Sequence, residues 1–123
     1  MREASPIDLP RLAKARLQLH YAAQLVGAIG DAWLPPQPDG SHTALHWDDS
    51  GEIRGHTIPG AEPWHAALHI QSLTLVCEGL RTRRSVPLEG LTRAEALAHV
   101  QAMLDDTLAG DSRPIAYPSH ALP

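Results

Sequence analysis

Histidines are the residues of this chain that most readily suggest chemistry, and five of the eight lie close together in the sequence. They are His42, His46, His56, His65 and His69. Imidazole is the commonest metal ligand in proteins and the usual acid or base near neutral pH. Two pairs, His42/His46 and His65/His69, have the His-x-x-x-His spacing, which on a helix places two rings one turn apart, where they can bind zinc.

The surrounding residues, however, alternate in the manner of β-strands, and four residues along a strand span about 13 Å. Two histidines of one pair therefore cannot share a metal, and a site would have to join different strands, for example through His46 and His69. The candidate ligands are His42, His46, His65, His69 and Asp48, with Asp49 as the alternative carboxylate. Such a set predicts zinc or another divalent transition metal and a small metal-dependent enzyme. The competing interpretation is that the histidines line the half-polar face of a sheet.

Two further groups of residues suggest other hypotheses. Cys77 is the single cysteine, so no intramolecular disulfide can form, and its place at the end of a strongly apolar segment predicts a buried, inert thiol. Arg81, Arg83 and Arg84 form a basic cluster that could contact an anionic ligand, a phosphate or a nucleic acid. No aromatic residues are interleaved with them, and the chain has a net charge of −4, which favours charged side chains protecting an edge strand. We predict no catalytic residue and do not expect nucleic-acid binding.

The elements that would position these residues form an α+β, two-layer pattern. A helix is predicted over about 9–29, ended by Gly27 and Gly30. An antiparallel β-meander of about four strands follows, and Asp48-Asp49-Ser50-Gly51 predicts a hairpin loop within it. The predicted strands cover residues 41–47, 52–58, 65–78 and 81–88.

A second helix closes the predicted domain. Thr92 and Glu95 have the spacing of a capping box, and Gly110 is placed to stop the helix. We therefore expect one α+β domain over residues 1–110 and a proline-rich, extended tail over residues 111–123. The three tryptophans, Trp33, Trp47 and Trp64, are expected to anchor the core or an interface.

The first helix has two apolar stripes on roughly opposite sides. One includes Leu12, Leu19 and Val26, and the other includes Leu17, Tyr21 and Leu25. A helix on the outside of a monomer needs one such stripe. Two stripes indicate that the helix is either enclosed by its own fold or shared with a partner. Because two helices can cover only one face of the sheet, we expect self-association through these residues, most commonly as a two-fold homodimer.

Length and composition limit the class of protein. The chain has 123 residues, of which 43% are hydrophobic and 20% charged, which is typical of a small soluble domain. We expect no leader segment, because the first residues are not apolar, and no membrane span, because no apolar run is long enough. A lone cysteine suits a reducing compartment. We expect a cytoplasmic protein of bacterial-type composition that acts by binding or assembly. The sequence does not identify a small-molecule ligand.

One segment suggests a family. Residues 19–27, Leu-His-Tyr-Ala-Ala-Gln-Leu-Val-Gly, followed by Leu34-Pro35-Pro36, resemble the opening of a bacterial family known only as a domain of unknown function. The resemblance implies a leading helix, a proline-containing loop, a β-meander and a closing amphipathic helix. It implies no catalytic residue, and the absence of Phe departs from the aromatic-rich strands of that family.

Overall fold

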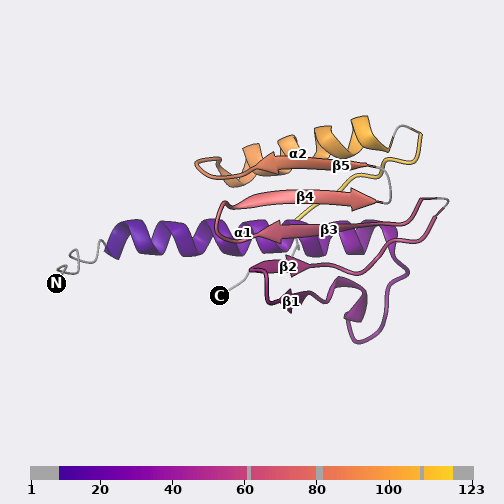
Figure 1. Cartoon of the computed structure of the whole chain (residues 1–123), viewed down its shortest axis with the longest axis horizontal. Helices are drawn as coiled ribbons and strands as arrows, with labels where there is room; N and C mark the ends of the chain where they lie inside the picture. Colours follow the sequence, from indigo (N-terminus) through magenta and orange to yellow (C-terminus); the bar gives the residue numbers. More distant parts are fainter. Residues whose placement is uncertain (1–8, 61, 80–81, 109, 118–123) are drawn as a thin grey trace.

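The computed structural model describes residues 9–60, 62–79, 82–108 and 110–117 and has the predicted α+β arrangement (Figure 1). In chain order its elements are α1 (Leu9–Trp33), the 3-10 helix η1 (Ser41–Thr43), β1 (His46–Asp48), β2 (Glu52–Arg54), β3 (Trp64–His69), β4 (Thr74–Gly79), β5 (Arg83–Pro87) and α2 (Arg93–Thr107). The five strands form one antiparallel sheet in the order β1-β2-β3-β4-β5. The fold class is therefore confirmed, with five strands in place of four.

The additional strand arises inside the segment 65–78, where a single strand was predicted. The chain turns between Ile70 and Leu73, and the Leu73 N–H donates to the carbonyl of Ile70 at 3.3 Å. Leu73 has φ 50°, a left-handed conformation that glycine or asparagine usually occupies. Because a leucine occupies this position, the sequence carries no glycine or asparagine there to indicate a turn. The prediction of one long strand is therefore wrong.

The first helix also differs from its prediction, because it continues through Gly27 and Gly30 to Trp33. A Cβ atom on Gly30 would lie 2.6 Å from the carbonyl oxygen of His42. This glycine therefore lets the backbone at η1 pack against the helix, and it does not end the helix. At α2 the capping box is present as predicted: the Thr92 side chain accepts from the Glu95 N–H, and the Glu95 carboxylate accepts from the Thr92 N–H.

Both helices contribute to a core on one face of the sheet. The strand pairing places Ile53, Leu68, Leu75 and Val86 in one row across four strands, and all four are buried. Fully buried side chains of the helices join the same cluster: Leu25, Val26, Ile29, Val100 and Leu104. Figure 1 shows α1 crossing the sheet and extending far beyond the edge of the strands at its N-terminal end.

The described part of the tail returns to the two helices. Ile115 is buried, and its N–H donates to Gln101 Oε1 of α2 at 2.8 Å. The Tyr117 hydroxyl donates to the carbonyl of Arg93 at 2.9 Å. The Tyr117 ring also packs edge-to-face on Tyr21 of α1, with 6.1 Å between ring centres, so residues 114–117 lie beside both helices.

Candidate functional site

The histidines proposed as metal ligands do not converge. His42 Nε2 lies 2.8 Å from Asp31 Oδ1, whereas the His46 ring packs against His56, with 5.0 Å between ring centres. His69 Nε2 lies 2.7 Å from Glu52 Oε2. Within residues 9–117, excluding the undescribed positions, no three metal-ligating side chains gather, so the predicted set with Asp48 is not brought together.

His65 and His69 lie on the face of the sheet opposite the helices, among ion pairs. Glu52, a buried charged residue of β2, accepts from Arg54 Nη2 at 3.0 Å as well as facing His69. Burial, assisted by the positive charge of Arg54, lowers the pKa of His65. Glu78 Oε1, 3.9 Å from His65 Nε2, acts in the opposite direction. This arrangement makes a polar sheet face in which the carboxylates are already paired.

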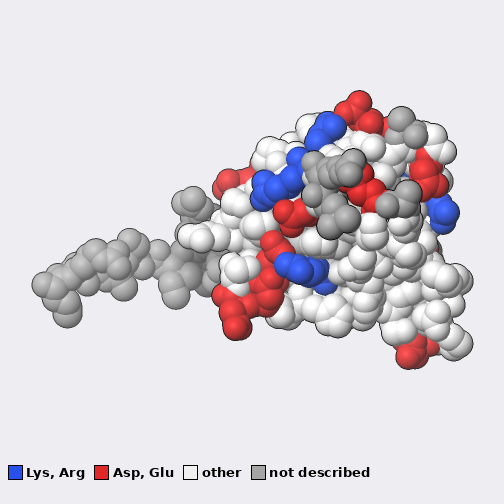
Figure 2. Space-filling model, turned by 45° about the vertical axis from the view of Figure 1, so that its right-hand side comes forward, with Lys and Arg blue, Asp and Glu red and all other residues white. Residues whose placement is uncertain are grey.

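The arginine cluster is also occupied by acidic partners. Arg83 Nε lies 3.7 Å from Glu78 Oε2, and Arg84 Nη1 lies 2.8 Å from Asp106 Oδ2. Arg81 lies outside the described residues. On the face displayed in Figure 2, basic and acidic side chains lie among one another and do not separate by sign. The described arginines therefore do not form an uncompensated surface for an anion.

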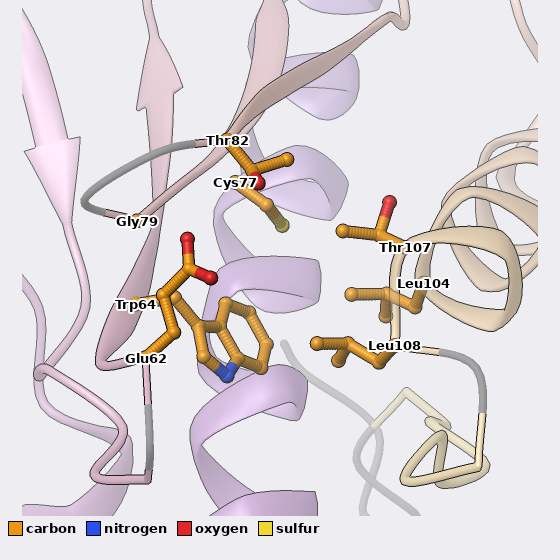
Figure 3. Close-up of a pocket in the computed structure, with 8 residues that line it drawn as sticks. All are labelled: Glu62, Trp64, Cys77, Gly79, Thr82, Leu104, Thr107 and Leu108. Atoms are coloured by element: carbon orange, nitrogen blue, oxygen red, sulfur yellow. The ribbon is translucent and has the colours of Figure 1, made fainter.

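Cys77 lines a small cavity of about 80 Å³ between the sheet and α2 (Figure 3). Figure 3 shows its sulfur pointing toward Leu104 and Thr107. Burial raises the pKa of the thiol to about 12, and no histidine is among the residues that line the cavity. A thiolate nucleophile is therefore strongly disfavoured at neutral pH.

The tryptophans have different surroundings. Trp33 is buried in the core and packs edge-to-face on Trp64, with 5.4 Å between ring centres. Trp47, in contrast, is 70% exposed. Trp33 and Trp64 thus anchor the interior, as expected, whereas Trp47 does not lie in the core.

The residues predicted for self-association divide along the length of α1. Leu25 and Val26 are 0% and 1% exposed and lie in the chain's own core. Leu19 and Tyr21 are half-buried, while Leu12 and Leu17 are 42% and 49% exposed. The C-terminal half of both apolar stripes is thus covered from within the chain, and placing Leu25 and Val26 at an interface was wrong because the sheet and α2 cover them. The N-terminal half remains uncovered.

A groove of about 730 Å³ runs beside the other half of α1; we call it the α1 groove. Its walls are His42, Thr43 and Leu45 on one side and residues 114–117 on the other, and its floor is made by α1. The α1 residues that line it include His20, Ala23, Gln24, Gly27, Ala28 and Asp31. Three of these floor residues, Ala23, Gly27 and Ala28, are small, and the other three are polar.

Two polar groups in the α1 groove have informative surroundings. His42 Nδ1 accepts from the Gln37 N–H at 3.1 Å, so Nε2 carries the proton that is donated to Asp31 at 2.8 Å. The Asp31 side chain is still 67% exposed and can take a second partner. The side-chain oxygen Oε1 of Gln24 is buried without a hydrogen-bond partner in the described structure, which is a costly state for a polar atom. Sequence reasoning missed Gln24 and Asp31, because no motif marks them and the walls of the groove come from distant segments.

Comparison with known proteins adds nothing to this geometry: no protein-family model, curated protein or solved structure matches the chain. The resemblance to the bacterial family therefore stays a prediction. Neither helix, as far as the structure describes them, combines the length and apolar character needed to cross a membrane.

Proposed function

We propose that this chain acts by assembly, as a homodimer in which a second copy covers the N-terminal half of α1. We call residues 10–17 of this helix the arm. The observation that carries the proposal is exposure: Pro10 and residues 12–17 are all exposed, although they continue a helix whose other half packs one face into the core. An assembly role accounts for a long helix that one copy of the chain uses only in part.

The arm has little to stabilise it in a single copy. Most helix stability in proteins comes from packing of an apolar face, and the exposed residues of the arm gain little packing within one copy. The first turn of α1 has no acidic residue to interact with the positive end of the helix dipole. Leu12 and Leu17 nevertheless offer apolar surface on two sides of the arm. Packing against a second copy would supply the missing stabilisation.

The distribution of charge favours a second copy as the partner. Residues 9–30 contain Arg11, Lys14 and Arg16 and no Asp or Glu. This segment carries +3 of a total charge of −4, so the remaining residues carry −7. A basic arm and an acidic body on one chain are complementary between two copies, and such complementarity favours encounter and orientation.

Size-exclusion chromatography with light scattering tests this proposal. At tens of micromolar we expect twice the monomer mass of 13.3 kDa, falling toward 13.3 kDa on dilution. The double variant Leu12→Glu/Leu17→Glu should remain at 13.3 kDa with a folded core. Ala98→Glu/Ala102→Glu, on the exposed side of α2, is the matched control and should still dimerise. A wild-type mass of 13.3 kDa at every concentration would refute the proposal.

A further inference from the structure

We infer that the α1 groove is the binding site for the arm of the second copy, which lies antiparallel to the α1 of the first. This inference rests on the proposed homodimer and specifies which surfaces meet. Its basis is that the arm and the floor of the groove are consecutive parts of one helix face.

The shared face follows from helical spacing. Ala13, Leu17, His20, Gln24, Ala28 and Asp31 succeed one another at intervals of three or four residues. Such residues form a single stripe along a helix. The last four line the α1 groove, whereas the first two belong to the exposed arm. Leu17 projects from this face at one end of the helix, and the α1 groove opens on the same face at the other end. Under a two-fold rotation, the leucine of each copy would therefore meet the groove of the other.

One antiparallel alignment of the two α1 helices brings several complementary residues of this face together. With the two-fold axis near Ala22 and Ala23, Leu17 of each copy lies opposite Ala28 of the other. Ala28 is 8% exposed and lines the α1 groove, so the leucine side chain would contact its methyl group at the floor of the groove. The same register places Lys14 of each copy opposite Asp31 of the other, because residues 14 and 31, like residues 17 and 28, are centred between Ala22 and Ala23.

The polar groups agree with this register. The exposed Asp31 carboxylate would gain the Lys14 ammonium as its second partner beside His42. The Arg113 guanidinium already donates to the carbonyl of Ala32 at the negative end of the α1 dipole, at 3.0 Å, and Lys14 of the second copy would add a further positive charge there. His20 of each copy would lie beside Gln24 of the other, and the Gln24 side chain, whose Oε1 has no partner in the described structure, would turn toward the imidazole to accept a hydrogen bond.

Disulfide trapping tests the register directly. The double variant Leu17→Cys/Ala28→Cys should form covalent dimers under mild oxidation, seen on a non-reducing gel. Either single variant should not, because residues 17 and 28 are about 16 Å apart along a helix, beyond disulfide reach. Leu12→Cys/Ala28→Cys, with the first cysteine on the other stripe, is the matched control and should stay uncrosslinked. Cys77 is buried and present in every variant, so the wild type reports any background.

Exchanging the charges of Lys14 and Asp31 tests the same register independently of crosslinking. Lys14→Glu and Asp31→Lys should each raise the dimer Kd at least about tenfold, and the double variant should recover most of that loss, as expected for a direct pair. A dimer by light scattering that neither crosslinks at 17 and 28 nor shows recovery would overturn this inference and leave the proposed homodimer intact. A monomer under all conditions would overturn both.

Discussion

Replacing Leu17 with alanine should weaken self-association while leaving the fold intact. Leu17 is 49% exposed in one copy of the chain. Full burial of a leucine side chain contributes about 1.5–3 kcal/mol, so covering the exposed half contributes about 1 kcal/mol per copy. The two-fold arrangement uses Leu17 twice, which gives about 2 kcal/mol per dimer. At about 1.4 kcal/mol for each factor of ten, the Kd should rise roughly 30-fold.

Sedimentation equilibrium over a range of protein concentrations measures this change, and urea unfolding at low concentration measures the fold. Surface substitutions usually change stability by less than about 0.5 kcal/mol, and alanine is a better helix former than leucine. Leu12→Ala is the matched control, because Leu12 is similarly exposed on the same arm but lies on the other stripe. Its Kd should change by less than about threefold. A larger effect at Leu12 than at Leu17 would refute the reasoning.

Three further outcomes follow from the structure of a single copy. Gly30→Ala should destabilise the fold, because its Cβ would lie 2.6 Å from the carbonyl oxygen of His42. Gly27→Ala, whose Cβ would have its nearest contact at 3.6 Å, should instead stabilise the fold by up to about 1 kcal/mol, because alanine has the higher helix propensity. Urea unfolding measures both changes, and the reverse order of stability would contradict this packing. Because burial lowers the pKa of His65 below 6.5, the unfolded chain binds a proton that the folded chain does not, so the free energy of unfolding should fall as the pH drops below about 6.5. His65→Gln should flatten that fall, and an unchanged slope would assign it to other groups. Cys77, with its pKa raised to about 12, should react with a thiol reagent only as urea unfolds the chain, and rapid labelling of the native protein would contradict its burial.

Much of the architecture was accessible from sequence, and the errors have identifiable causes. The capping box at Thr92 and the hairpin loop after Asp48 are local signals, and both elements are present. The turn ending at Leu73 lacks a local signal, because a leucine adopts the left-handed conformation there. Gly30 resembles a helix terminator in sequence, yet it is required by a contact with a segment twelve residues away.

The candidate site was less accessible, because it depends on distances that no local pattern encodes. Alternation along the strands indicates that His65 and His69 share a face but does not indicate that Glu78 and Glu52 lie beside them. Helical periodicity likewise reveals two apolar stripes on α1. It cannot reveal where along the helix the body of the protein ends, and this boundary decides that Leu25 is covered while Leu17 is not.

Hydrogen exchange of the arm measures the central claim most directly, namely that a second copy covers residues 10–17. Amides in an unpacked helix exchange quickly, whereas amides in a packed helix exchange through rarer openings. At concentrations where the dimer forms, peptides from the arm should be protected, and dilution below the Kd should remove that protection while the amides of β3 stay protected. Fast exchange of the arm at every concentration, beside a protected sheet, would contradict the account.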